Sequence, residues 1–307
     1  MVGKGERLLV IAPHPDDETL GAGGLIQRVR ARGGTARIVL ITAGDGYGEA
    51  VAHETGRPQP RPAQFVAYGE RRLRESRSAV RTLAGDHVRL QILGFPDGGV
   101  EGLLRAHWWR SHPARSTTTN ATDPPYDEAL EPDVPYDGAD LRREIANILR
   151  EEKPTLIALP DPLDQHPDHR AAGLFTLLAI NDWMRDRSKR APVAPKLLAY
   201  LVHWSDWPPT WDAPAPVIDT DAALDLPPTL PPRELDRITV ELTDEEIATK
   251  RAALAKYTSQ QEAMPVFLAA FVRRTEPFTI LTAAELRNVE YMIEPAAQQP
   301  LTPSPEP

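Results

Sequence analysis

The sequence contains no cysteine among its 307 residues. Disulfide bonds are therefore excluded, and so are metal sites built from thiolates, so that a zinc ion would have to be held by histidine and carboxylate side chains. No apolar run is long enough to cross a bilayer, and the first residues lack the apolar stretch and cleavage site of a secretory signal. These absences predict a cytoplasmic protein that does not enter a membrane.

Positive charge is also scarce, because 35 Lys and Arg residues face 44 Asp and Glu residues and leave a formal net charge of −9. A chain of this charge is unsuited to non-specific binding of nucleic acid, so we expect no nucleic-acid partner. The length suits one large α/β domain with insertions or two small domains.

Ionisable side chains are concentrated just after the first apolar segment. The run Arg7–Ala12 predicts a buried strand, and two prolines then fix a rigid turn. Within this turn lie His14, Asp16, Asp17 and Glu18. Buried charge is costly unless it is paired or bound to a cation, and a histidine and an aspartate three residues apart share one side of a helical turn. The pattern suits a divalent metal such as zinc; the alternative is that Asp17 and Glu18 only cap the next helix.

A second ionisable cluster follows the strand predicted over residues 155–159. His166 and His169 are three residues apart at the N-terminus of a helix predicted to continue through residues 170–184. A lone histidine is more often structural than a ligand. Two histidines here, together with His14 and three nearby carboxylates, all after strands, favour a shared metal site instead.

Strands alternate with helices along the chain. Further strands are predicted over 35–42, 88–93, 196–203 and, at an edge, 237–242; helices are predicted over 19–32, 64–84, 140–152, 243–256 and 260–271. This alternation predicts an α/β fold with a parallel sheet, which would bring both ionisable turns to one edge.

A nucleotide-dependent oxidoreductase is disfavoured, because the negative charge of the first turn would repel a pyrophosphate. Asp97, after strand 88–93, could contact a ligand or only organise its turn.

Taken together, these motifs resemble the LmbE-like (PIG-L) family of zinc-dependent N-deacetylases. Residues 13–18 read PHPDDE and residues 164–169 read DQHPDH, the two histidine motifs of that family. The family's R-x-x-E, L-G-x-P-D-G and C-terminal helix patterns are similar to residues 72–75, 93–98 and 250–260. The resemblance covers most of residues 7–275 and is weakest in 103–138 and 204–236.

The resemblance implies a Rossmann-like three-layer sandwich with a mostly parallel sheet. We expect a single domain over residues 1–293, with an insertion at about 103–138 and a C-terminal extension at about 204–293. Residues 294–307 are expected to form a disordered tail, because they are polar and rich in proline.

The resemblance also implies the roles of individual residues. His14, Asp17 and His169 would bind one zinc ion. Asp16 would act as general base, and His166 would stabilise the oxyanion or protonate the leaving amine, with Asp168 as its partner. Arg72 matches a substrate-binding position, and Asp97 is assigned to substrate binding with it.

The activity that the resemblance implies is hydrolysis of an N-acyl group, foremost acetyl, from an N-acetylglucosamine-type sugar or glycoconjugate. Zinc would supply the attacking hydroxide, because it lowers the pKa of a bound water to about 7. A conjugate amidase that cleaves a larger amide, and a carbohydrate-binding protein with a structural metal, are the alternatives. Another divalent metal in place of zinc stays an alternative, because nitrogen and oxygen ligands select weakly among metals. A homo-oligomer stays an alternative to a monomer.

Overall fold

The structure, a computed structural model, describes residues 2–185, 194–231, 236–282 and 284–287, which include seven strands, nine helices and a further helical turn over 284–287. The strands are β1 Arg7–Ala12, β2 Thr35–Thr42, β3 Arg89–Phe95, β4 Leu156–Pro160, β5 Lys196–Tyr200, β6 Arg237–Glu241 and β7 Thr275–Leu281. The helices are α1 Asp17–Ala31, α2 Gly48–Thr55, α3 Pro62–Ala84, α4 Val100–Arg105, α5 Gly138–Glu152, α6 Pro167–Arg185, α7 Asp244–Leu254, α8 Thr258–Ala263 and α9 Pro265–Ala270.

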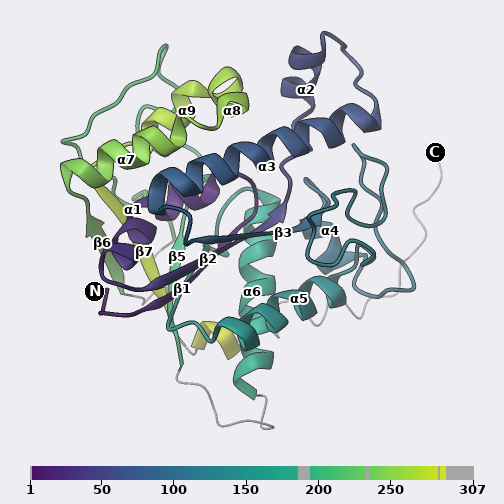
Figure 1. Ribbon diagram of the computed structural model, residues 1–307, viewed down its shortest axis with the longest axis horizontal. Coiled ribbons are helices and arrows are strands. Elements are labelled where there is room, and N and C mark those ends of the chain that lie inside the picture. The colour runs from purple at the N-terminus through teal and green to yellow at the C-terminus, as the bar shows by residue number, and fades with distance from the viewer. Residues whose placement is uncertain (1, 186–193, 232–235, 283, 288–307) are drawn as a thin grey trace.

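The strands form one sheet in the order β3-β2-β1-β4-β5-β7-β6 (Figure 1). β1 pairs in parallel with β2 on one side and with β4 on the other, and β3 and β5 extend these pairs in parallel. The strand order therefore reverses between β1 and β4, and ligands of open α/β sheets bind outside the carboxyl ends of the strands at such a point. Both ionisable turns, after β1 and after β4, lie there.

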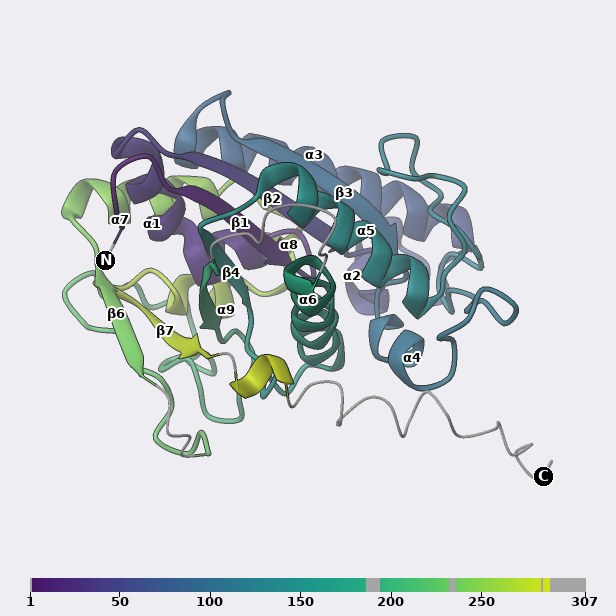
Figure 2. The same cartoon turned by 90° about the horizontal axis from the view of Figure 1, so that it is seen from below.

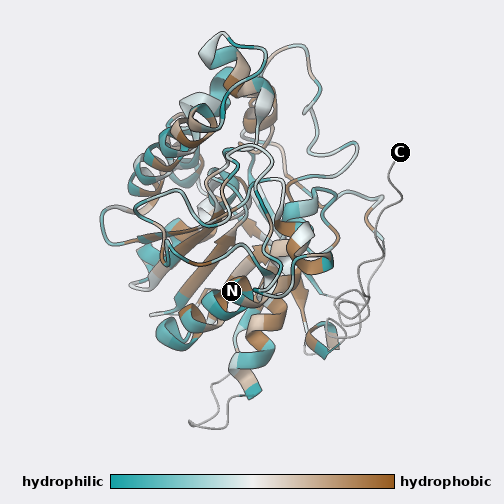
Figure 3. Cartoon of the chain, turned by 90° about the vertical axis from the view of Figure 1, so that its right-hand side faces the viewer, coloured by the Kyte–Doolittle hydropathy of each residue, from teal (hydrophilic) through white to brown (hydrophobic). Residues whose placement is uncertain are grey.

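The sheet is buried on both faces, which explains why its parallel strands are continuous apolar runs. Alternate residues of β1 point to opposite sides: Leu8 and Val10 belong to one core cluster, and Leu9 and Ile11 to the other. Helices α1, α3 and α7 cover the first face, and α5 and α6 cover the second (Figures 1 and 2). Figure 3 shows the hydrophobic strands at the centre, with hydrophilic residues on the outer sides of the helices. The three-layer α/β fold predicted from the sequence is confirmed.

The predicted elements differ from the structure mainly after β5. β7 was not predicted, because Pro277 interrupts its apolar pattern; it pairs antiparallel with β5 and β6 and places β6 at the sheet edge, as expected. The helix predicted over 260–271 is instead two short helices, α8 and α9, because Met264 precedes a proline and leaves the helical conformation. The short helix α2 was not predicted either.

The segment predicted as an insertion at about 103–138 begins within α4 and is irregular from residue 106 to residue 137. It packs beside the carboxyl end of β3: the Tyr136 hydroxyl donates to the Gly94 carbonyl, and the Tyr126 hydroxyl donates to the Asp45 carboxylate. The disordered tail predicted over 294–307 lies outside the described residues. Within the described residues, no helix is both long enough and apolar enough to span a membrane.

A buried ion pair holds the helix that carries the first motif. α1 is interrupted at Ala22, where φ is −143°, so that backbone N–H groups beyond it lose their helical partners. The Glu276 carboxylate from β7 accepts the N–H of Gly24 at 2.7 Å and pairs with the Lys250 ammonium of α7 at 2.8 Å. Both charged side chains are only 1% exposed. The C-terminal part of the chain thus fixes the start of α1 beside the sheet.

We expect Glu276→Ala to destabilise the protein by about 3–5 kcal/mol, because it leaves the Lys250 charge buried and unpaired. Thermal unfolding would then occur roughly 10 °C lower. Asp86→Ala is the matched control. The side chains of Asp86 and Arg81, which pair with each other, are 76% and 71% exposed, and such exposed ion pairs contribute at most about 1 kcal/mol to stability. Equal shifts for the two variants would show that the buried pair does not hold α1.

Candidate metal centre and active site

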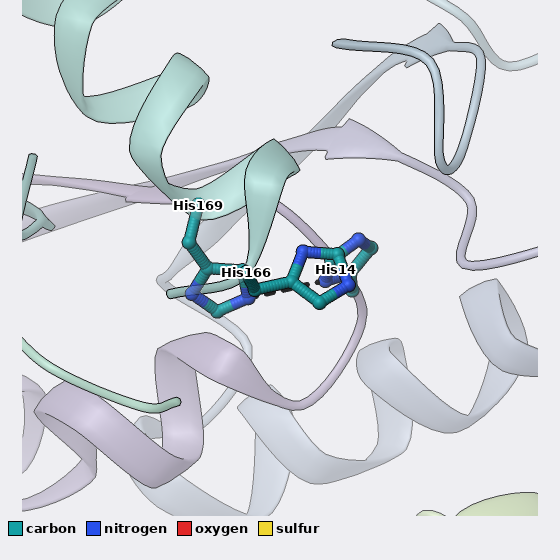
Figure 4. Close-up of side chains that lie close together, drawn as sticks. All are labelled: His14, His166 and His169. Carbon is teal, nitrogen blue, oxygen red and sulfur yellow. Dashed lines mark hydrogen bonds between the residues drawn. The ribbon is translucent and has the colours of Figure 1, made fainter. Parts of the chain in front are cut away.

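Three side chains from two distant turns meet at the carboxyl edge of the sheet. His14 follows β1 and His169 lies in the first turn of α6 (Figure 4). Asp17 begins α1. Asp17 Oδ2 lies 3.2 Å from His14 Nδ1 and 3.1 Å from His169 Nε2, and the two ring nitrogens are 3.2 Å apart. The structure therefore brings together the three side chains that were predicted to bind a metal.

The spacing and chemistry of these three atoms fit a metal ion. Donors that bind one zinc tetrahedrally at about 2.0–2.1 Å lie about 3.3 Å from one another, close to the separations seen here. Two imidazole nitrogens and one carboxylate oxygen, on side chains at most 10% exposed, form a donor set that suits zinc and leaves a fourth position for another ligand. Three overlapping sets of neighbouring side chains also have the composition of metal sites: His14–His166–His169, Asp17–His169–His203 and His14–Asp97–Asp168.

The Asp17 carboxylate does not cap α1, which excludes the capping interpretation for this residue. Its Oδ2 accepts the His14 N–H at 2.9 Å and faces both rings. Burial alone would raise the pKa of Asp17, but His169 and His14 hold that pKa well below its usual range. Conversely, despite burial, Asp17 and Asp164 raise the pKa of His169 to about 9. Asp17 and Asp164 thus favour positive charge on the His169 ring, at whose Nε2 a metal and a proton would compete.

Asp164 lies on the side of the His169 ring that faces away from the candidate metal centre. It was not assigned to the site from the sequence, although it opens the second motif. Its Oδ2 lies 3.4 Å from His169 Nδ1 and accepts the N–H groups of Val202 and His203 at 2.9 and 3.0 Å. Its Oδ1 accepts the His166 N–H at 2.9 Å. A carboxylate on the far side of a ligating histidine fixes the orientation of its ring, so Asp164 is a positioning residue.

Asp168 was predicted to pair with His166, and the structure corrects this prediction. Its carboxylate accepts the N–H groups of Gly98 and Val100 at 2.7 and 3.0 Å and lies 3.4 Å from His14 Nε2. The reason is the helical geometry of α6, which turns this side chain towards the loop after β3. Asp168 therefore supports the ring of His14.

Asp97 shares this task, since its Oδ1 lies 3.1 Å from His14 Nε2 and its other oxygen accepts the Gly46 N–H. Burial would raise the pKa of Asp97, but His14 and Arg72 lower it. Asp97 thus does more than organise its own turn. It also lines the cavity over the site, where its assignment to substrate binding stays a prediction.

His166 lies beside the other two histidines, 4.9 Å from the His14 ring and 5.1 Å from the His169 ring between centroids. Its Nδ1 accepts the backbone N–H of Asp168 at 3.2 Å, so in the neutral ring Nε2 carries the hydrogen. Burial, with His14 and His169 adding to it, lowers the pKa of His166 to about 4. A charged His166 paired with the Asp168 carboxylate therefore does not fit this geometry, whereas a neutral ring that donates its Nε2–H does.

Asp16 occupies a strained position, with φ of 107° in the left-handed region. Its Oδ2 accepts from the Arg72 guanidinium at 3.1 Å, and the same guanidinium donates to the carbonyls of Pro15 and Gly44 at 2.6 and 2.8 Å. Burial raises the pKa of Asp16 to about 8 against the effect of Arg72. These bonds make Arg72 a positioning residue for Asp16. Arg72 also lines the cavity, where its predicted contact with substrate stays a prediction.

A cavity of about 440 Å³ opens over these residues. Besides the predicted residues, His203 from the end of β5, Tyr47, Gln260 and Phe267 line it, and none of them was assigned to the site from the sequence. His203 carried a usable signal, because it is the last residue of the strand predicted over 196–203 and follows β5, which ends at Tyr200. Tyr47 and Phe267 carried none, since they lie in segments without a recognisable motif.

Comparison with known proteins gives concordant results. The chain matches the model of the PIG-L family, described as GlcNAc-PI de-N-acetylase, over residues 9–180. It is 29% identical over 174 residues to 1D-myo-inositol 2-acetamido-2-deoxy-alpha-D-glucopyranoside deacetylase 2 of Saccharopolyspora erythraea, covering 56% of this chain and 55% of that protein. It is 26% identical over 182 residues to diacetylchitobiose deacetylase of Thermococcus kodakarensis, covering 57% and 49%. The chain thus spans about half the length of the curated relatives it matches.

Among solved structures, N,N'-diacetylchitobiose deacetylase from Pyrococcus horikoshii has the same fold, with a TM-score of 0.55 at 18% identity, covering 90% of this chain and 84% of that one. The family model covers more than half of this chain and includes both histidine motifs. The turns after β1 and β4 that meet at the candidate metal centre thus lie within the matched residues. The chain belongs to the PIG-L (LmbE-like) family.

Proposed function

We propose that this protein is a zinc-dependent hydrolase that removes the N-acetyl group from an N-acetylglucosamine-type sugar or glycoconjugate. The observation that carries the proposal is the triangle of His14, Asp17 and His169 beside Asp16, at the floor of an open cavity. The names of the relatives, which are deacetylases of acetamido sugars, support the substrate class.

The metal would be held by His14, Asp17 and His169, and zinc bound there would supply a Lewis acid that polarises the amide carbonyl and makes water more acidic. Asp16 is placed to take the proton from the attacking water. Its pKa of about 8 reflects burial next to carboxylates, and a cation beside Asp17 would lower that pKa and leave Asp16 ionised as a base. Arg72 holds the Asp16 carboxylate in place throughout.

His166 would donate its Nε2–H to the carbonyl oxygen as negative charge develops on it, a role that the neutral ring can fill. The water oxygen forms the new bond to the carbonyl carbon, the C–N bond breaks, and the amine leaves with the proton that Asp16 had accepted. The products are acetate and a free amino sugar. One such donor typically contributes about 100–1000-fold to the rate.

The proposal is tested by incubating the zinc-loaded protein with N-acetylglucosamine and its glycosides and measuring acetate and free amine. We expect equal amounts of both products, and loss of turnover after a chelator, with recovery on return of zinc. Release from amides of bulky acids but not from acetamides would favour a conjugate amidase. Tight sugar binding without any release would favour a carbohydrate-binding protein with a structural metal.

A further inference from the structure

A second, larger cavity adjoins the metal centre. It measures about 550 Å³ and shares His203, Met264 and Phe267 with the cavity over the metal centre. Its outer wall is formed by Trp204, Trp207 and Trp211, from the segment that follows β5. The shared wall residues make the two cavities neighbours, so the second one is within reach of a molecule that is bound over the metal centre and extends past these side chains.

Most polar side-chain atoms in this wall already form hydrogen bonds, either with one another or with groups outside the wall. The indole N–H of Trp204 donates to Thr229 Oγ1, and that of Trp207 donates to the Asp225 carbonyl, each at 2.8 Å. The amide of Gln165 donates to the Ser205 hydroxyl at 3.2 Å. The wall therefore offers ring faces and hydrocarbon to an occupant, and few hydrogen-bonding groups.

The wall is also held in place by aromatic contacts. The ring of Phe267 stacks on His203 at 5.3 Å and meets Phe271 edge to face at 5.3 Å, and Trp207 meets Phe271 at 5.4 Å. The backbone N–H of His203 is fixed by Asp164. A pre-formed, largely apolar cavity of this size is typical of a small-molecule site.

We infer that this cavity is a subsite for an apolar part of the substrate, carried either on the sugar as an aglycone or on the nitrogen as an acyl chain. The inference rests on the proposed function and adds the substrate class to it. Trp211 lies at the rim with 41% of its surface exposed, where a bound apolar group would cover it. The three tryptophans lie in residues 204–236, a segment in which the family resemblance is weak.

Three substrates separate the two sources of the apolar group: methyl N-acetylglucosaminide as reference, phenyl N-acetylglucosaminide, and the methyl glycoside of N-octanoylglucosamine. We expect kcat/KM for at least one apolar compound to exceed the reference by about tenfold or more, the effect of burying a group of phenyl size. The compound that gains identifies the source. Ratios near one for both compounds, with the reference hydrolysed, would overturn the subsite and leave the proposed function standing.

Trp211→Ala should lower the ratio of kcat/KM for the favoured apolar compound to kcat/KM for the reference several-fold. Trp204→Ala is a second variant in case the first rearranges the rim. Trp109→Ala is the matched control, because Trp109 is 62% exposed and lies outside the cavity wall, and it should keep the wild-type ratio. An unchanged ratio in both subsite variants would contradict the inference.

Binding of sugars that carry no amide provides a readout independent of turnover: phenyl against methyl glucoside for an apolar aglycone, and methyl N-octylglucosaminide against its N-methyl analogue for an apolar chain on the nitrogen. By titration calorimetry, wild type should bind the apolar member of at least one pair about tenfold more tightly, and Trp211→Ala should lose this preference. If no sugar is hydrolysed but this preference is found, the subsite stands and the proposed function fails. If neither hydrolysis nor preference is found, both fail.

Discussion

Asp16→Asn is expected to lower kcat by about 10²–10⁴-fold while the protein still binds about one zinc ion per chain. The change removes the proton acceptor but preserves the shape of the side chain. Asparagine tolerates the left-handed conformation that Asp16 adopts, with φ of 107°, so the turn between β1 and α1 should persist. Arg72 keeps its two bonds to backbone carbonyls in the variant. The measurements are acetate release and zinc content on the same sample.

Asp86→Asn is the control for this experiment, because Asp86 is an exposed carboxylate whose side chain pairs only with Arg81 in the described structure. It should leave both activity and zinc content unchanged. Near-normal turnover by Asp16→Asn would remove Asp16 from the mechanism. Loss of zinc together with activity would instead make Asp16 part of the metal centre.

His14→Ala and His169→Ala are each expected to abolish both zinc binding and turnover. Each variant removes one of the three proposed metal ligands. Loss of a residue that only hydrogen-bonds to a ligand typically weakens metal affinity by about 10–100-fold, so loss of a ligand itself should weaken it further. Zinc content after dialysis, and competition with a chelator of known affinity, measure the effect. Added zinc should not restore turnover.

His112→Ala provides the comparison, since His112 is exposed in the insertion and belongs to none of the histidine and carboxylate clusters around the site. It should bind zinc as wild type does. If His14→Ala keeps its zinc, the ion is held by another set, of which Asp17, His169 and His203 form the nearest alternative.

The residues that meet at the metal centre could be predicted because each follows a strand in the sequence. Once strands alternate with helices, a parallel sheet places the ends of β1 and β4 at one edge, and two short motifs are enough to define a site. The bounds of β1 and β2 were also predictable, since continuous apolar runs end at prolines or glycines.

The partners around the site were harder to predict, because they depend on directions that the spacing alone does not fix. Asp168 is adjacent to His169 in sequence, yet its carboxylate faces the loop after β3 and the ring of His14. Asp164 acquires its role only because β5 ends beside it, where Val202 and His203 donate to it.

The second cavity depends on contacts between residues far apart in the chain. Trp211 and Phe267 line the same space, although 55 positions separate them and neither segment has a periodic pattern that predicts the contact. The break between α8 and α9, which places Met264 and Phe267 in that wall, follows from a single proline. Such features come from tertiary packing and could not be read from local patterns.

The proposed hydrolysis depends on a single cation held by the turns after β1 and β4. The most direct test is a crystal structure of the zinc-loaded protein, with anomalous diffraction at the zinc edge to locate the ion. We expect one strong peak bonded to His14 Nδ1, Asp17 Oδ2 and His169 Nε2, with Asp16 beside the remaining position. A peak held by other side chains, or no peak in a protein that releases acetate, would contradict the account.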